Sequence, residues 1–425
     1  MQKIKIAIIG AGSSYTPEII EGLVQASQDL PVGEIALMDI DAQRLDVMAG
    51  FCNRFLRHLG HSDIRVTPVM ESLPAIQGAR FIITQIRVGG NRHRILDEKI
   101  PLKYGLIGQE TTGPGGMMKA LRTIPVMLAL TKEIEVTNPE AWIINYTNPT
   151  GLVTEAVSSF SKARIAGLCS GVLFPGWYAA KALAVPAESI HYAYAGLNHL
   201  GFAYDFKVNG RAITGEEFDR VAEVASRGGV DYELIKTLKL IPSPYLQYYY
   251  HSAKKVAGQQ NEGRTRGEEV LELEGEIFRA YADPNTFTKP EALSRRGGGG
   301  YSQVALSVMK AIYQDKEEVV IVNTPNRGAV RNLPDDAVVE IPCLINANGI
   351  HRLLTGRIPE AVWGLVSALK NYEQLTVQAA VSGSREAALL ALLAHPLVRD
   401  IDIARPLLAE LLEANRAFLP QFYPC

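Results

Sequence analysis

Runs of apolar residues alternate with segments of helical periodicity through the first 170 residues of the chain. This alternation is typical of a parallel sheet whose strands are joined by helices. A helix is predicted after the first strand, with Thr16 as its N-cap and Pro17 in its first turn. The strands are predicted at residues 3–10, 34–41, 79–90, 141–151 and 164–171. Each ends in small or polar residues, and ligands bind at the carboxyl ends of the strands in such sheets.

From residue 171 the pattern becomes mixed, with short strand-like segments between helical ones. Strands are predicted at 195–210, 317–328 and 336–346, and helices at 176–185, 268–282, 360–381 and 384–398. The glycine-rich stretch 294–302 is predicted to be a flexible loop. We therefore expect an α/β protein in which a Rossmann-like domain (1–170) packs against a mixed α/β domain (171–425), as in lactate and malate dehydrogenases.

Composition narrows the function classes. Hydrophobic residues make up 47% of the chain and the formal net charge is −2, which argues against a general nucleic-acid surface. No apolar run reaches the ~18 residues of a membrane span, and the N-terminal residues show no basic region, apolar region or cleavage site, so we expect no leader segment. Four scattered cysteines predict free thiols in a reducing compartment. These features favour a cytoplasmic enzyme with neither a nucleic-acid nor a membrane partner.

A glycine-containing turn between the first strand and the first helix predicts a dinucleotide site. Glycines there let the backbone approach a pyrophosphate, and the helix N-terminus supplies N–H donors. Tyr15 stands where the motif would have its third glycine, whose usual role is helix–strand packing. An acidic residue that ends the second strand favours NAD over NADP. The residues expected to contact the cofactor are Gly10, Gly12, Ser13, Ser14 and Asp39.

Two residues at strand ends, Cys169 and His199, are candidate metal ligands. A thiolate and an imidazole can share a transition-metal ion and leave positions open for substrate oxygens. From spacing alone, a buried thiol and a core histidine remain the simpler interpretation. The tyrosine-rich segment 244–250 has the same two interpretations, because a tyrosine beside a cation could act as a base whereas most tyrosines in such a run pack in the core.

Several polar side chains lie near the expected binding edge. The segment 86–116 is rich in Arg, Lys, Asp and Glu, and arginine suits phosphate or carboxylate oxygens, although a solvated loop is an equal alternative. Arg266 lies in a second such segment, "NEGRTRGEE". Asn148, in a turn after a strand, could bind sugar hydroxyls or close the turn.

Taken together, these strings resemble glycoside hydrolase family 4, the NAD- and metal-dependent glycosidases, and most of all its 6-phospho-β-glucosidases. The resemblance spans nearly the whole chain. It rests on the ordered strings "IGAGSSYTPE", "IPLKYGLIGQETTGPGG", "NYTNPTG", "GLC", "GLNHLGF", "PYLQYY", "NLPDDAVVEIPC" and "LLEANRAF".

The resemblance implies a glycosidase outside the two-carboxylate scheme. Hydride transfer from the sugar C3 to NAD⁺ would give a ketone, which a metal, usually Mn²⁺, would polarise so that the C2 proton becomes acidic. Loss of that proton, elimination of the aglycone, addition of water and return of the hydride complete the cycle. The family also implies homodimers or homotetramers.

By the same resemblance, each site residue takes a role. Cys169 and His199 match the metal ligands, Tyr245 the base that removes the C2 proton, and Asn148 a contact to the sugar. Arg94 and Arg266 match arginines associated with the phosphorylated substrate.

Ser170 departs from the family pattern, because the residue after the metal cysteine is commonly Asp in 6-phospho-α-glucosidases and Asn in 6-phospho-β-glucosidases. Serine cannot readily act as an acid, which weakens an α preference. A family 4 specificity for α-linked or non-phosphorylated sugars stays open. So do a simple NAD-dependent 2-hydroxy acid dehydrogenase and a non-enzymatic NAD-binding redox sensor.

Overall fold

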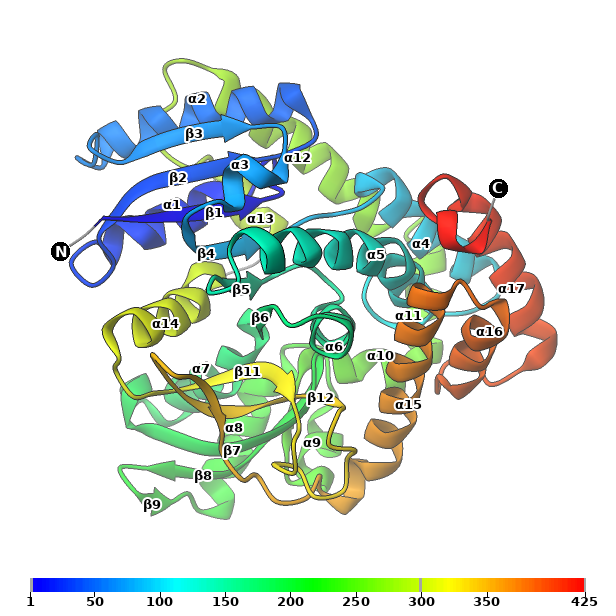
Figure 1. Cartoon of the computed structure of the whole chain (residues 1–425). Helices are drawn as coiled ribbons and strands as arrows, with labels where there is room; N and C mark the ends of the chain where they lie inside the picture. The colour runs from blue at the N-terminus through cyan, green and yellow to red at the C-terminus, as the bar shows by residue number, and fades with distance from the viewer. Residues whose placement is uncertain (1–2, 298–299, 424–425) are drawn as a thin grey trace.

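The computed structural model describes residues 3–297 and 300–423 of the chain. It contains a mixed sheet that runs through the whole molecule, with helices on both of its faces (Figure 1). The strands are β1 (Ile4–Ile9), β2 (Val32–Met38), β3 (Arg65–Val69), β4 (Ala79–Thr84), β5 (Trp142–Asn145), β6 (Arg164–Gly167), β7 (Ile190–Leu197), β8 (Leu200–Val208), β9 (Arg211–Ala212), β10 (Ile241–Pro242), β11 (Glu318–Pro325), β12 (Val338–Asn346) and β13 (Gly349–Arg352).

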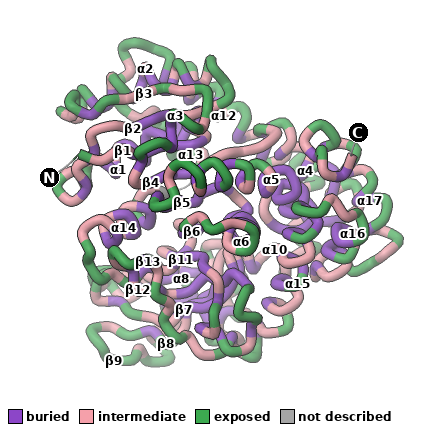
Figure 2. Tube along the Cα trace, viewed as in Figure 1, coloured by how far each residue is buried: buried purple, intermediate pink, exposed green. Residues whose placement is uncertain are grey.

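The N-terminal strands form a parallel sheet in the order β3-β2-β1-β4-β5-β6, which is the strand order of a Rossmann fold. The apolar alternation of the first half therefore predicted the fold class correctly. The strands themselves are shorter than predicted, because the polar residues at their carboxyl ends turn away into loops. Strand β3 was missed; its residues are mostly half-buried or exposed, as Figure 2 shows at this edge of the sheet.

The second half continues the same sheet with antiparallel strands. Strand β11 pairs with β6 through Asn323 and Gly167, and β12, β7, β8 and β10 follow in that order. One hydrophobic cluster draws residues from both halves. The second half therefore packs firmly against the first, as the absence of a long linker indicated. The division into domains at residue 170 stays a prediction.

The helices are α1 (Thr16–Gln25), α2 (Ala42–His58), α3 (Ser72–Ile76), α4 (Gly90–Lys103), α5 (Gly113–Thr137), α6 (Thr150–Phe160), α7 (Phe174–Leu183), α8 (Gly215–Ser226), α9 (Tyr232–Leu238), α10 (Gln247–Tyr250), α11 (Ser252–Asn261), α12 (Arg266–Ala282), α13 (Ala292–Arg296), α14 (Tyr301–Gln314), α15 (Glu360–Ser382), α16 (Arg385–Ala394) and α17 (Ile401–Ala414). Helix α12 packs against α2 and α4, and α14 packs against α1, so helices from the second half cover the N-terminal sheet (Figure 1).

Three local predictions were wrong. The predicted strand 195–210 consists of the end of β7 and the whole of β8, which are antiparallel and joined by a turn at Asn198 and His199. Helix α1 has Tyr15, not Thr16, at its N-cap, and the Thr16 hydroxyl donates instead to the carbonyl oxygen of Ala11 at 2.7 Å. The predicted loop 294–302 contains the end of α13 and the start of α14, and residues 298–299 of that prediction lie outside the described part of the chain.

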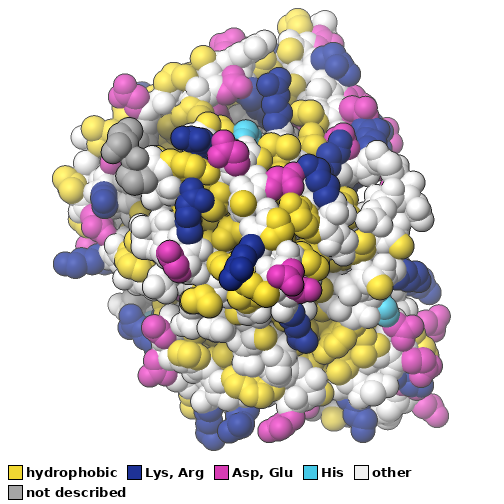
Figure 3. Space-filling model, turned by 90° about the vertical axis from the view of Figure 1, so that its right-hand side faces the viewer, with side chains coloured by type: hydrophobic (Ala, Val, Ile, Leu, Met, Phe, Trp, Pro, Cys, Tyr) yellow, Lys and Arg dark blue, Asp and Glu magenta, His cyan; other side chains and the backbone are white. Residues whose placement is uncertain are grey.

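The surface agrees with the near-neutral composition. Acidic and basic side chains are interspersed over the face in Figure 3. Within residues 3–297 and 300–423, no helix is long and apolar enough to cross a membrane.

Candidate active site

The glycine turn after β1 has the geometry of a dinucleotide site. Gly10 has φ +86°, and a Cβ there would lie 3.0 Å from the backbone of Gln85. The amide of Gly12 donates to Asp39 Oδ2 at 2.7 Å, and a Cβ on Gly12 would collide with that carboxylate. Both positions therefore require glycine, and the turn fits a cofactor that needs close backbone approach.

Asp39 follows β2, and its two carboxylate oxygens accept the amides of Gly12 and Asp41. Each oxygen keeps a second lone pair that can accept a ribose hydroxyl. Ser13 is half-buried in the turn, whereas Ser14 is fully buried and its hydroxyl donates to Glu274 at 3.5 Å. The five residues predicted for the cofactor thus lie together at the end of β1 and β2, and their contact with NAD stays a prediction.

A second group of residues lies beyond the ends of β6, β7 and β8. Cys169 follows β6, and its Sγ accepts the amide of Gly171 at 3.3 Å. His199 occupies the two-residue turn between β7 and β8 with φ +62°, a conformation that histidine adopts more readily than most residues. Its ring stacks on Tyr245 with the centroids 3.8 Å apart.

Tyr245 lies near both candidate metal ligands. It is the middle residue of the short helical turn Pro244–Leu246 that Ser243 caps. Burial raises the pKa of its phenol strongly, and the Cys169 thiol is the next largest cause. The fold therefore brings Cys169, His199 and Tyr245 together from three separate parts of the chain, although spacing alone favoured unrelated core positions.

The thiol and imidazole fit a transition-metal ion. Burial, and then Glu340, raise the pKa of Cys169 to about 12, so a cation is needed to hold the thiolate. Burial lowers the pKa of His199 to about 4, which keeps the imidazole neutral and able to bind metal. Among the described residues, no group of three or more His, Cys, Asp or Glu side chains is arranged to hold an ion.

Asn148 contributes a buried oxygen near the end of β5. Its Nδ2 donates to the carbonyl oxygen of Tyr146 at 3.4 Å, while its Oδ1 has no hydrogen-bond partner among the described residues. Such an orphaned acceptor suits a ligand hydroxyl. A sugar contact through Asn148 stays a prediction.

Glu110 gathers three cations beside this group, a cluster that the sequence did not reveal. It accepts bonds from Arg87, from Arg94 at 3.2 Å and from Lys119 at 2.8 Å. The three cations hold the pKa of Glu110 well below its usual range despite burial. Burial, and then Arg87, lower the pKa of Lys119 to about 7. Glu110 also influences the titration of His199, so the cluster adjoins the candidate metal ligands.

The two predicted arginines lie in different surroundings. Arg94 is buried on α4, where its guanidinium group pairs with the carboxylates of both Glu98 and Glu110. Arg266 is half-exposed and donates to Glu269 and to the backbone carbonyls of Arg295 and Arg296. Arg94 thus belongs to the cation cluster around Glu110, whereas Arg266 holds the C-terminal end of α13 through its backbone carbonyls. The contact of either arginine with a phosphate stays a prediction.

A parallel sheet with a glycine turn, next to a thiol, an imidazole and a tyrosine, is the framework of a dinucleotide-dependent enzyme. Two sequence profiles match the chain: Family 4 glycosyl hydrolase over residues 5–181, and Family 4 glycosyl hydrolase C-terminal domain over residues 194–398. The chain belongs to this glycosyl hydrolase family.

Similar proteins carry related names. A protein from Bacillus subtilis named probable 6-phospho-beta-glucosidase is 39% identical, and the alignment covers 99% of this chain and 98% of the Bacillus subtilis protein. A 6-phospho-beta-glucosidase from Escherichia coli is 36% identical, with coverage of 100% and 98%. A phospho-alpha-glucosidase from Clostridium acetobutylicum is less similar, at 30% identity, with coverage of 98% and 99%.

Solved structures agree with the fold. A 6-phospho-beta glucosidase from Thermotoga maritima, solved with manganese, NAD⁺ and glucose-6-phosphate, has a TM-score of 0.90 at 35% identity, covering 98% of this chain and 99% of that one. A malate dehydrogenase from Cryptosporidium parvum has a TM-score of 0.54 at 15% identity, and the alignment covers 90% of this chain and 100% of the dehydrogenase. This similarity concerns the fold alone. The predicted fold class and family are therefore confirmed.

Proposed function

We propose that this chain is a 6-phospho-β-glucosidase that works with bound NAD⁺ and a divalent metal, Mn²⁺ first among the candidates. The observation that carries the proposal is the stack of His199 on Tyr245 beside Cys169, at the sheet edge where the glycine turn also lies. The higher identity to proteins named β-glucosidases than to those named α-glucosidases supports the β preference. Ser170, which is a poor acid, argues against an α preference, although it also differs from the Asn that is common in 6-phospho-β-glucosidases.

In this proposal the chain's residues hold and deprotonate the sugar. Cys169 and His199 hold the metal, and Asn148 orients the sugar through its orphaned oxygen. Arg94, with Arg266 at the adjoining start of α12, provides positive charge for the 6-phosphate. When bound, NAD⁺ accepts and returns a hydride, and the metal polarises the sugar oxygens.

Tyr245 takes the C2 proton on its phenol oxygen. In the protein alone, burial opposes ionisation of that phenol. Arg94 lies close enough to Tyr245 to be affected by its charge, and a cation at Cys169 would favour the phenolate further. The base therefore gains its strength only in the loaded site.

Turnover of p-nitrophenyl 6-phospho-β-glucoside tests the proposal. We expect turnover that requires NAD⁺, Mn²⁺ and reductant, without stoichiometric accumulation of NADH. The α-linked and non-phosphorylated p-nitrophenyl glucosides should react far more slowly. Full activity in a chelator with no cofactor, none having co-purified, would contradict the proposal. NADH formed in proportion to product would instead indicate a dehydrogenase.

A substitution at Tyr245 tests the assigned base. Tyr245→Phe should lower kcat by about a hundredfold or more, because general-base catalysis contributes on that order. Its NAD⁺ affinity should stay within a factor of about two, since the phenol does not touch the glycine turn. Tyr250→Phe, an exposed residue of the same segment, is the matched control and should stay fully active. A fully active Tyr245→Phe would remove Tyr245 from this role.

Assembly and location complete the proposal. We infer a homodimer or homotetramer in the cytoplasm; the free thiols of Cys52, Cys169 and Cys343 agree with a reducing compartment. Light scattering of the purified protein measures the assembly directly, and a monomeric mass at micromolar concentration would contradict it.

A further inference from the structure

A buried carboxylate next to the first turn of α1 collects donors from four separate segments. Glu274 of α12 accepts the Ser14 hydroxyl at 3.5 Å and Asn91 Nδ2 at 2.9 Å. It also accepts Arg44 at 3.2 Å and Arg296 at 2.9 Å, and only 9% of its side chain is exposed. The first turn of α1, where a dinucleotide would place its pyrophosphate, is therefore flanked by two guanidinium groups.

The ring of Tyr15 packs against one of these guanidinium groups, that of Arg296. The guanidinium carbon of Arg296 lies 4.6 Å from the centroid of the Tyr15 ring, within the range of a cation–π contact. Tyr15 occupies the position where the dinucleotide motif would have its third glycine. The departure from the motif thus brings a cation from the second half of the chain against the helix N-terminus.

In the cluster around Glu274, two guanidinium groups share one carboxylate, and two polar atoms lack a hydrogen-bond partner among the described residues. Two guanidinium groups, Arg44 and Arg296, share the single carboxylate of Glu274, and Arg87 lies near enough to influence its pKa. Arg296 Nε has no hydrogen-bond partner among the described residues. Asn91, which also donates to Glu274, is more than nine-tenths buried, and its Oδ1 has no partner among the described residues either. Surplus positive charge and an unused N–H donor suit a phosphate, and the unused acceptor suits a ribose hydroxyl.

We propose that Arg296 is a cofactor-binding residue, which donates to the pyrophosphate of the dinucleotide while Tyr15 and Glu274 hold its guanidinium in place. Arg44, which also donates to the carbonyl oxygen of Gly12 at 2.9 Å, supplies the second positive charge. The assignment rests on the proposed use of NAD⁺ and adds a contact from the second half of the chain to a site that the sequence motif confines to the first.

Ligands that differ in phosphate content test the assignment. We would measure the Kd of NAD⁺ and ADP-ribose by calorimetry, and that of adenosine by NMR titration. Arg296→Met should weaken NAD⁺ and ADP-ribose by about ten- to a hundredfold, the cost of a lost charge-assisted hydrogen bond, and leave adenosine unchanged. Arg296→Lys, which keeps the charge but not the planar donor pair, should fall between.

Arg295→Met is the matched control. Arg295 precedes Arg296, is more than half exposed and pairs with Glu276 at 2.7 Å, so its loss should change none of the three affinities. The assignment is wrong if Arg296→Met binds NAD⁺ within twofold of the parent, or if it weakens adenosine as much as NAD⁺. A parent protein that binds no NAD⁺ would instead overturn the proposed function itself.

Discussion

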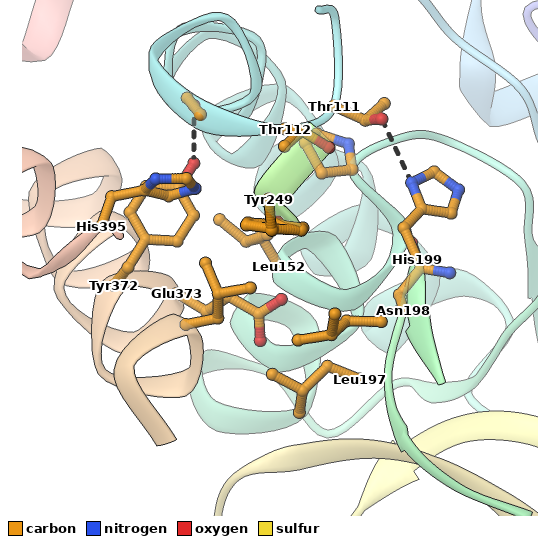
Figure 4. Close-up of a pocket in the computed structure, with 14 residues that line it drawn as sticks. Thr111, Thr112, Leu152, Leu197, Asn198, His199, Tyr249, Tyr372, Glu373 and His395 are labelled. Atoms are coloured by element: carbon orange, nitrogen blue, oxygen red, sulfur yellow. Dashed lines mark hydrogen bonds between the residues drawn. The ribbon is translucent and has the colours of Figure 1, made fainter. Parts of the chain in front are cut away.

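The hydrogen bonds around Thr111 determine which nitrogen of His199 is free, and so lead to a sharp prediction. Gln109 Oε1 accepts the amides of Thr111 and Thr112 at 2.5 and 2.6 Å, which fixes it as the amide oxygen. The Thr111 hydroxyl lies 3.0 Å from this oxygen and must donate its one hydrogen to it. Its oxygen, 3.1 Å from His199 Nδ1, therefore accepts from Nδ1–H (Figure 4). This arrangement leaves the lone pair on Nε2 for a metal ion.

Thr111→Val removes this support while keeping the size of the side chain. The imidazole then loses the partner of its Nδ1–H in a half-buried site and can adopt the other tautomer. Loss of a hydrogen bond behind a metal ligand weakens metal affinity by about ten- to a hundredfold. In free energy this is about 1.4 to 2.8 kcal/mol. We therefore expect the Kd for Mn²⁺ to rise by at least about tenfold.

Electron paramagnetic resonance of free Mn²⁺, titrated in the presence of NAD⁺, measures this Kd. Thr112→Val is the matched control, because Thr112 lines the small enclosed pocket beside Tyr249 and has no bond to His199 among the described residues (Figure 4). An unchanged Kd for Thr111→Val, or equal weakening in both variants, would refute the tautomer argument.

Two further predictions concern stability. Asp97 and Arg122 form a fully buried two-bond ion pair at 2.8 and 2.6 Å, so Asp97→Asn should cost about 3–5 kcal/mol and lower Tm clearly. Glu140→Gln at an exposed pair should cost about 1 kcal/mol or less, and equal shifts in Tm would contradict the role of burial. Burial lowers the pKa of His395 to about 3, so below about pH 6.5 the unfolded chain takes up a proton that the folded chain refuses, and stability falls toward pH 3. His395→Asn should therefore show a smaller loss of Tm between pH 7 and 4.5 than the parent, and an equal or larger loss would contradict this reasoning.

The strands and the glycine turn could be predicted because burial on both faces produces continuous apolar runs. Helix α4 could not, since most of the side chains that it buries are polar or charged, among them Arg94, Asp97 and Glu98. Their partners on other segments, such as Glu110 and Arg122, allow charged residues to face the interior. The hydrophobic pattern does not reveal such a helix, because its sequence resembles that of a solvated loop.

The grouping of the candidate site residues could not be predicted from the sequence pattern either. Cys169 and His199 are separated by a helix and a strand, so only the sheet order β6-β11-β12-β7, and the stacking of His199 on Tyr245, bring them into one place. The resemblance to family 4 supplied this juxtaposition, whereas spacing did not. The link between Glu274 and Arg296 joins helices α12 and α13, and no motif of the first half could reveal it.

The central claim is that one metal ion lies between Cys169 and His199 next to bound NAD⁺. The most direct measurement is an anomalous difference map at the manganese edge, from crystals grown with NAD⁺, Mn²⁺ and glucose 6-phosphate. We predict one strong peak, bonded to Cys169 Sγ and His199 Nε2. A fully loaded crystal with manganese bound elsewhere, or with the two side chains bonded to no ion, would contradict the account.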